Sequence, residues 1–226
     1  MTAEEAYSLG LRYLRAGYYT KALEQLNRVR TYYRDDPYAL KAELAIADVH
    51  FKRNEYDAAR IAYEDFMRAH PRYRELDYVV YRLGDTIAKG APTVAARDQA
   101  RTRQAVNAWT GFAARFPDSD HREAVEAGLG KLRNRLGRKE LVVARFYARR
   151  KAWPAVAGRA RGLLELYPTS PDRPEALALL AEAYARSGQA ELAALALERL
   201  RGEAPGSRFE RRVVAAIEDG AAADTK

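Results

Sequence analysis

Apolar and small residues recur along this chain at the three-to-four-residue spacing that is typical of amphipathic helices. The helical segments also resemble one another. In four of the copies a compact residue, which we call the anchor of the repeat, is followed twelve positions later by a proline. The anchors and prolines of four copies are Ala59 and Pro71, Ala105 and Pro117, Val156 and Pro168, and Ala193 and Pro205. A copy near the start has its anchor at Ala22, with its proline displaced to Pro37. One structural unit is therefore repeated five times.

Each copy is preceded by a second helical segment that carries a small residue of its own. These residues are Gly10, Ala47, Gly84, Ala144 and Ala181. Small residues on both helices let the two antiparallel helices approach closely, and a proline after the second helix prevents its continuation. This arrangement is typical of the tetratricopeptide repeat, a helix–turn–helix unit of about 34 residues. The sequence therefore predicts an all-α fold, a right-handed superhelical solenoid of five such repeats with about ten to eleven helices.

Two departures from the repeat define the expected domain organisation. Residues 89–103 exceed the length that the third repeat needs and predict a long loop, while residues 121–150 contain no strong breaker and predict a long helix. We expect repeats one to three, residues 1–117, to form a half that binds substrate peptides. Repeats four and five with a capping helix, residues 118–218, form the expected partner-binding half, and residues 219–226 a disordered tail.

Positive charge is concentrated in the middle of the chain. Residues 97–161 hold 16 Lys and Arg against 6 Asp and Glu, a net charge of +10, whereas the whole chain carries +8. Such a surplus favours an acidic protein surface, an anionic lipid or a nucleic acid as partner, or it forms a solvated helix face. The aromatic residues of this stretch mostly occupy core positions of the repeat, which argues against base stacking and hence against nucleic acid as a partner.

Composition excludes several kinds of chemistry. The chain has no cysteine, so disulfides, thiolate metal sites and cysteine nucleophiles are excluded. The three histidines, His50, His70 and His121, lie in separate repeats without the spacing of a metal site, and no glycine-rich phosphate-binding motif is present. No apolar run reaches the roughly 18 residues that could span a bilayer. We therefore expect no catalysis, no cofactor and no metal.

Three segments are more specific than the general tetratricopeptide pattern. They are LDYVVYRLG (76–84), RFPDSDHREA (115–124) and RKELVVARFYARRKAWPAVAGRARGLLELYP (138–168). In these segments the chain resembles the BamD family of outer membrane assembly lipoproteins, and the resemblance extends over residues 4–205. It implies a five-repeat protein on the periplasmic face of the bacterial outer membrane, held there by a lipidated N-terminal cysteine. That cysteine is absent from this sequence, and we expect the targeting segment to precede Met1 in the full-length protein.

The resemblance also implies partners. BamD-like proteins bind the POTRA domains of the barrel insertase BamA through their C-terminal repeats, and they receive unfolded outer-membrane β-barrel proteins at their N-terminal repeats, alongside further assembly lipoproteins. Arg159 aligns with an arginine at the BamA contact, and the basic residues Arg149, Arg150 and Lys151 precede it. From the residues alone, Arg159 lies at the edge of an apolar stripe, where its stem packs and its guanidinium reaches outward. The alternative is an intramolecular pair with an acidic residue of the next repeat.

A tyrosine-rich segment near the N-terminus offers a second candidate surface. Tyr32, Tyr33 and Tyr38 surround the turn after the first repeat, and Arg34 lies beside them. Tyrosines next to an arginine suit an extended peptide that ends in an aromatic residue and a carboxylate. The alternative, equally open at this point, is that the tyrosines pack repeat one against repeat two. The sequence also leaves open a different periplasmic repeat adaptor, of the cell-division or Tol-Pal-associated type.

Overall fold

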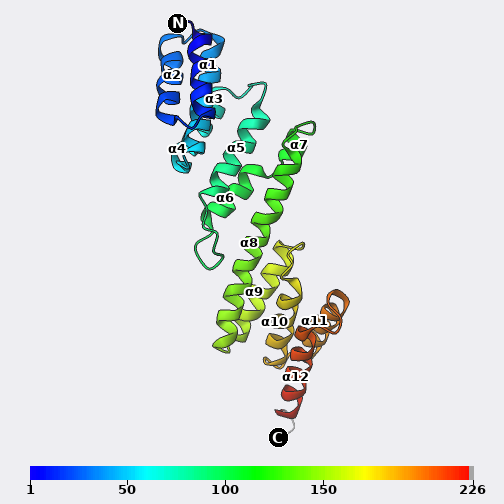
Figure 1. Ribbon diagram of the computed structural model, residues 1–226. Coiled ribbons are helices and arrows are strands. Elements are labelled where there is room, and N and C mark those ends of the chain that lie inside the picture. The colour runs from blue at the N-terminus through cyan, green and yellow to red at the C-terminus, as the bar shows by residue number, and fades with distance from the viewer. Residues whose placement is uncertain (224–226) are drawn as a thin grey trace. The chain divides into compact units, whose positions relative to one another are not determined.

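A computed structural model describes residues 1–223, and within them the chain forms twelve helices and no strand (Figure 1). The helices are α1 (Ala3–Arg15), α2 (Tyr19–Tyr32), α3 (Pro37–Lys52), α4 (Tyr56–Ala69), α5 (Leu76–Lys89), α6 (Ala100–Trp109), α7 (Phe112–Arg115), α8 (Arg122–Arg149), α9 (Trp153–Leu166), α10 (Arg173–Ala185), α11 (Ala190–Glu203) and α12 (Arg208–Ala223). This confirms the predicted all-α class. The number of helices exceeds the ten to eleven predicted because Gly111, with a left-handed φ of 78°, separates α6 from α7.

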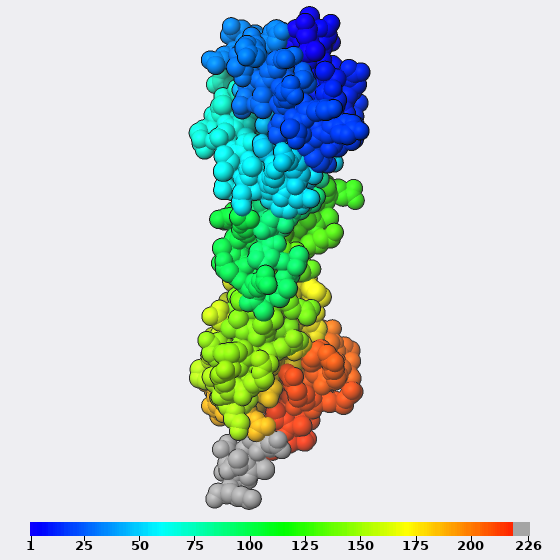
Figure 2. Space-filling view, turned by 60° about the vertical axis from the view of Figure 1, so that its left-hand side comes forward, coloured from blue at the N-terminus to red at the C-terminus, as the bar shows by residue number. Residues whose placement is uncertain are grey.

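The helices pair as the repeat predicts. Helix α1 packs against α2, α3 against α4, α5 against α6, and α10 against α11, and the second part of α8 shares a core cluster with α9. All five anchors are buried, namely Ala22, Ala59, Ala105, Val156 and Ala193. The small residues of the preceding helices are buried as well. In Figure 2 the first two hairpins form one continuous surface, coloured blue to cyan.

A common turn joins the two helices of four repeats. In each, the residue two positions before the second helix has a left-handed φ, at Gly17 (79°), Asn54 (61°), Lys151 (57°) and Gly188 (71°). Glycine adopts this conformation freely and asparagine tolerates it, whereas a lysine there is strained by about 1–2 kcal/mol. Lys151 is also one of the residues predicted to bind a partner, and that role stays a prediction.

Contacts divide the chain into two compact units. The N-terminal unit comprises Met1–Ala91 and Ala100–Leu129, and the C-terminal unit comprises Pro92–Gln99 and the chain from Gly130 onward. The boundary between these units falls within α8, which continues without interruption. The roles assigned to the two halves stay predictions.

The insertion in repeat three is shorter than predicted. Only residues 90–99 lie between α5 and α6, instead of residues 89–103, because the helical pattern resumes at Ala100. Within the C-terminal unit, the Lys139 ammonium on α8 donates to the carbonyl oxygen of Ala96 over 2.9 Å. This bond ties the loop to α8.

The last helix is longer than predicted. Helix α12 continues to Ala223, so residues 219–223 of the predicted disordered tail are helical, in keeping with the high helix propensity of their three alanines. The rest of that tail, residues 224–226, lies outside the described residues. Among residues 1–223, no helix combines the length and the hydropathy needed to cross a membrane.

Candidate partner-binding and peptide-binding sites

The turn between α8 and α9 gathers three of the basic residues predicted to bind a partner. Arg149, Arg150 and Lys151 are all exposed there. The guanidinium carbon of Arg150 lies 3.6 Å from the ring centroid of Phe146, whose side chain is 41% exposed. A cation stacked on an exposed aromatic ring offers both charge and apolar area, a combination that suits an interface.

Arg159, on α9, forms an intramolecular ion pair. Its Nη1 donates to Oε2 of Glu140 on α8 over 3.1 Å. The acidic residue therefore belongs to the same repeat, and not to the next one as the sequence-based alternative had it. The Arg159 side chain is 48% exposed, and its one bond to Glu140 leaves further N–H donors for an external carboxylate. Contact with a partner stays a prediction.

The four residues predicted to bind a peptide do not form one cluster. Among the described residues, no hydrogen bond or ring contact joins Tyr32, Tyr33, Arg34 and Tyr38 to one another. Tyr32 is 78% exposed and Arg34 is exposed. The hydroxyl of Tyr33 instead donates to the main-chain carbonyl of Met1 over 2.5 Å.

Tyr38 connects the first two repeats. Its ring centroid lies 5.3 Å from that of Tyr7 on α1, and the Lys41 ammonium lies 4.9 Å from its centroid. A hydrogen bond to the Glu4 carboxylate raises the pKa of Tyr38. Through Tyr7, this side chain also adjoins a groove that the sequence did not reveal.

That groove lies in the N-terminal unit, between α1, α3 and α5. It consists of two cavities of about 330 and 440 Å³ that share Asp48 and Tyr78 in their walls, and we call it the N-terminal groove. Its other polar wall residues are Tyr7, Lys41, Tyr73 and Glu75 at one end, and Arg15, Tyr19, Lys52 and Arg82 at the other. One signal could have found it. Lys41, Asp48 and Lys52 share one face of a largely apolar helix, at intervals of seven and four residues.

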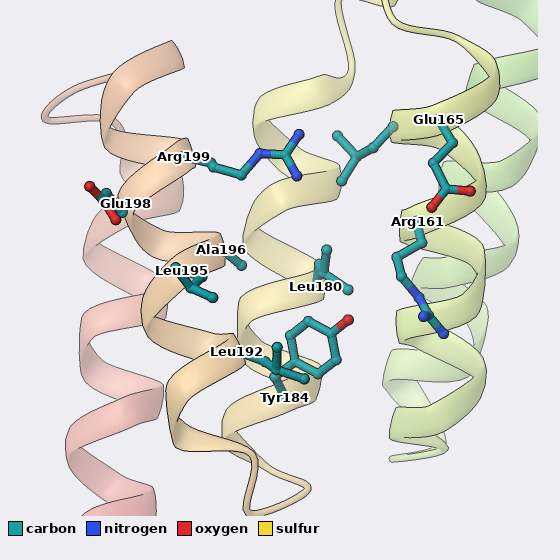
Figure 3. Close-up of a pocket in the computed structure, with 10 residues that line it drawn as sticks. Arg161, Glu165, Leu180, Tyr184, Leu192, Leu195, Ala196, Glu198 and Arg199 are labelled. Carbon is teal, nitrogen blue, oxygen red and sulfur yellow. The ribbon is translucent and has the colours of Figure 1, made fainter.

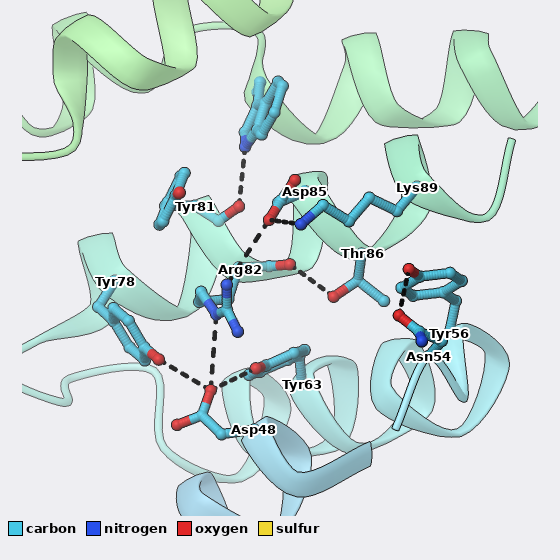
Figure 4. Close-up of polar contacts among 11 residues, drawn as sticks. Asp48, Asn54, Tyr56, Tyr63, Tyr78, Tyr81, Arg82, Asp85, Thr86 and Lys89 are labelled. Carbon is cyan, nitrogen blue, oxygen red and sulfur yellow. Dashed lines mark hydrogen bonds and ion pairs between the residues drawn. The ribbon is translucent and has the colours of Figure 1, made fainter. Parts of the chain in front are cut away.

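A polar cluster forms the floor of the N-terminal groove (Figure 4). Oδ1 of Asp48 accepts hydrogen bonds from the hydroxyls of Tyr63 (2.5 Å) and Tyr78 (2.8 Å). Nε of Arg82 lies 3.6 Å from the same oxygen, and the Arg82 guanidinium carbon lies 3.6 Å from the ring centroid of Phe51. The cluster joins α3, α4 and α5, because each of these helices contributes at least one member.

Burial sets the protonation of this cluster. It raises the pKa of Asp48, and the hydrogen bonds from the two tyrosines and the charge of Arg82 offset that effect only in part. Burial also raises the pKa of Tyr63 and of Tyr78, with the charge of Asp48 adding to it. Both hydroxyls therefore stay protonated and act as donors to Asp48.

A second groove lies in the C-terminal unit between α9, α10 and α11, with a volume of about 390 Å³ (Figure 3). Leu180 and Tyr184 of α10 form its floor, and Leu192 and Leu195 of α11 form one wall. Leu195 is 57% exposed. In the sequence these leucines look like any helical core stripe, so periodicity alone does not reveal the groove.

The histidines have separate neighbours. Nδ1 of His50 lies 2.7 Å from Oε2 of Glu55, and Nε2 of His70 lies 2.9 Å from Oε2 of Glu43. The ring of His121 stacks on a tyrosine. In the part of the chain that the structure describes, no group of three or more His, Cys, Asp or Glu could hold a metal ion.

Comparison with known families identifies the chain. The family model described as "YfiO: Outer membrane lipoprotein" matches residues 1–200. The chain belongs to this family. Curated relatives in this comparison carry the BamD name. The family match therefore confirms the resemblance that the three sequence segments indicated.

Two of these relatives show the extent of the similarity. The outer membrane protein assembly factor BamD of Pasteurella multocida is 30% identical over 200 residues, which cover 84% of this chain and 77% of that protein. BamD of Xylella fastidiosa strain Temecula1 is 31% identical over 214 residues, covering 91% and 73%. Among solved structures, the complex titled "TPR2AB-domain:pHSP90-complex of yeast Sti1" matches with a TM-score of 0.50 and 13% identity, covering 95% of this chain and 82% of that one. That likeness concerns the tetratricopeptide fold alone.

The structure explains why one YfiO-type segment has its particular residues. Residues 76–84 lie in α5, where Tyr78 and Arg82 reach the polar cluster. Gly84 faces the indole of Trp109, whose Nε1 donates to the carbonyl of Tyr81 over 3.1 Å. The segment thus supplies part of the groove floor and a glycine that lets the Trp109 indole of α6 approach α5.

Proposed function

We propose that this protein is a non-enzymatic scaffold of the β-barrel assembly machinery, lipid-anchored in its full-length form at the periplasmic face of the outer membrane. The observation that carries the proposal is the family match, together with relatives that are named outer membrane protein assembly factors. Tetratricopeptide hairpins suit this role because their stacked helices present grooves and side surfaces for protein ligands. In this proposal repeats four and five bind the POTRA domains of a BamA-like insertase, and repeats one to three receive unfolded barrel proteins.

The α8–α9 turn and Arg159 form the proposed contact with the POTRA domains. Three observations support it: the exposed basic side chains, the Arg150–Phe146 stack and the left-handed backbone at Lys151. The equivalent turn positions in repeats one and five hold glycine. A lysine that adopts the left-handed conformation in spite of its strain is expected where its charge is used.

Charge reversal on α9 tests this contact. Arg159→Glu is expected to weaken binding to a purified POTRA region by about thirtyfold or more, because it removes a donor and sets a carboxylate against an acidic surface. The melting temperature should change little, since Arg159 is half exposed and its pair with Glu140 contributes little to stability. Arg161→Glu, on the same helix and also exposed, is the matched control and should keep its affinity. Equal affinities for wild type and Arg159→Glu, measured by titration calorimetry, would contradict the contact.

Lys151→Gly tests the contribution of Lys151 to the same contact. The substitution relieves the left-handed strain and is expected to raise stability by about 1 kcal/mol, while it lowers POTRA affinity several-fold through the lost charge. Opposite signs of the two effects separate a binding role from a structural one. Unchanged affinity in this variant would remove Lys151 from the contact.

Capture of barrel precursors is the second part of the proposal. Tyr32, Tyr33, Arg34 and Tyr38 are the proposed receiving surface, supported by the exposed ring of Tyr32 and the exposed charge of Arg34. Replacing Tyr33 and Tyr38 together by alanine is expected to weaken capture of a barrel-derived C-terminal peptide about tenfold, because two apolar contacts are lost. Fluorescence anisotropy with a labelled peptide measures this. Unaltered capture by a folded double variant would exclude the surface.

A further inference from the structure

One helix of the C-terminal unit presents an exposed apolar strip. Leu192 and Leu195 of α11 are 43% and 57% exposed. They form one wall of the groove whose floor is Leu180 and Tyr184, which we call the C-terminal groove (Figure 3). Removing such side chains from water is favourable. Because the exposed leucines and the hollow lie side by side on one surface, each of two copies of the chain can supply both, as a two-fold symmetric interface requires.

The charges of α11 are arranged symmetrically about Leu195. Glu191 lies four residues before it and Arg199 four residues after it, so both lie on the same side of the helix as the leucine. Both charged side chains are exposed, and within residues 1–218 no hydrogen bond or ion pair engages their charged groups. When two copies of this helix pack antiparallel about Leu195, each Arg199 lies opposite Glu191 of the other copy. Helix α11 is therefore complementary in charge to itself.

The equivalent surface of repeat two lacks this complementarity. Ile61 has the same position relative to its anchor as Leu195 has, and it is 50% exposed beside a groove of about 490 Å³ between α2, α3 and α4. The residues four positions before and after Ile61 are Asp57 and Asp65, both acidic, and each pairs with an arginine of its own chain. Neither position therefore offers an opposite charge to a second copy. The two grooves are alike in exposed apolar area and differ in charge pattern.

We propose that α11 and the C-terminal groove form a homodimer interface, in which two copies of the chain pack α11 against α11 antiparallel with Leu195 at the two-fold axis. The ion pair between Arg199 and Glu191 forms twice, and the exposed leucines of each copy pack over the groove of the other. This inference goes beyond the proposed function, since self-association does not depend on which proteins the scaffold binds. A contact built on one helix pair lies at the low end of the size range of specific interfaces, so we expect a dissociation constant of about 10–100 µM.

Charge reversal tests the antiparallel pairing, with sedimentation equilibrium as the measurement. Glu191→Arg and Arg199→Glu should each weaken dimerisation by about tenfold or more, because each sets like charges together at both ends of the helix pair. The double variant Glu191→Arg/Arg199→Glu restores both ion pairs in reversed order and should dimerise within about threefold of the wild type. Leu195→Glu should be monomeric at every concentration, since it places two carboxylates at the axis. All three positions are exposed, so the variants are expected to fold.

A cysteine at the axis gives an independent geometric test. The chain has no cysteine of its own, so Leu195→Cys introduces a single thiol, which meets its own copy at a two-fold axis. Oxidation with copper–phenanthroline should convert most of this variant to a disulfide-linked dimer. Ile61→Cys, at a similarly exposed position of α4, is the matched control and should stay largely monomeric. The proposal is overturned if the two cysteine variants cross-link equally, if the double charge reversal does not restore dimerisation, or if the wild type is monomeric throughout, which would leave the C-terminal groove to a different protein.

Discussion

Trp109→Ala is expected to lower the unfolding free energy of the N-terminal unit by about 3–5 kcal/mol, a large part of a typical domain's stability. The indole is 4% exposed and is contacted by two glycines from different helices, Gly84 of α5 and Gly128 of α8. Removing it empties a space that neither helix can fill by a side-chain rearrangement. Its ring also stacks near Tyr81, with the two planes 7° apart. Urea unfolding followed by circular dichroism measures the loss.

Gly84→Ala tests the same packing from the other side. A β-carbon at Gly84 would overlap the indole ring, and the ring cannot retreat because its far edge abuts Gly128 in the same way. The unfolding free energy of the variant is therefore expected to be about 1–3 kcal/mol lower than that of the wild type. Gly162→Ala in α9 is the matched control. A β-carbon there meets nothing within 4 Å, and alanine should stabilise the helix by about 0.5–1 kcal/mol. Stabilisation by Gly84→Ala would contradict the packing account.

The hairpin fold was predictable because the repeat encodes it in single residues. An anchor such as Ala59 or Ala193 must be small whatever its neighbours are, so it marks the helix–helix contact directly in the sequence. Boundaries were less predictable. The break between α6 and α7 depends on the conformation of one glycine, and the start of α6 at Ala100 follows a loop whose anchoring by Lys139 comes from a distant segment.

The basic surface that is proposed to bind a partner is visible in the sequence as charge, but its geometry is not. The run Arg149–Lys151 is visible as charge. The left-handed backbone of Lys151 is a property of the turn, and it emerges only when the four equivalent turns are compared in space. The Arg159–Glu140 pair joins residues nineteen positions apart on two helices, and charge counting does not choose one of several acidic residues.

The N-terminal groove could not be predicted from the sequence, for a different reason. Its residues come mainly from three first helices, α1, α3 and α5, with Tyr19 of α2 and Tyr73 and Glu75 of the segment before α5. Each helix alone shows only a few polar positions, of the kind that solvent-exposed faces also carry. Asp48 illustrates this. In the sequence it is an acidic residue within an apolar helix, and only the structure brings Tyr63, Tyr78 and Arg82 to it. Because these three side chains come from α4 and α5, Asp48 couples the shape of the groove to the stacking of repeats two and three.

Asp48→Ala is therefore expected to lower the stability of the N-terminal unit by about 3–5 kcal/mol, since it leaves the Arg82 charge and two tyrosine hydroxyls without their acceptor in a largely buried place. Asp48→Asn should lower the stability less, by about 1–3 kcal/mol, because the amide oxygen still accepts hydrogen bonds from the hydroxyls of Tyr63 and Tyr78. The two tryptophans of the chain lie in different units, so a Trp153→Phe background lets Trp109 fluorescence report the N-terminal unit alone. Equal losses for the two variants would show that the hydrogen bonds contribute nothing beyond the charge.

The pH dependence of this difference gives an independent check. Because burial raises the pKa of Asp48 in the fold, the folded state holds this proton more tightly than the unfolded state does. The stability of the wild type relative to Asp48→Asn should therefore be greatest below the unfolded pKa of about 3.9, and it should decline as the pH rises through the higher folded pKa. Other groups titrate alike in both proteins and cancel from the comparison. A difference that instead grows with pH would mean that Arg82 and the two hydroxyls outweigh burial and lower the pKa of Asp48 in the fold.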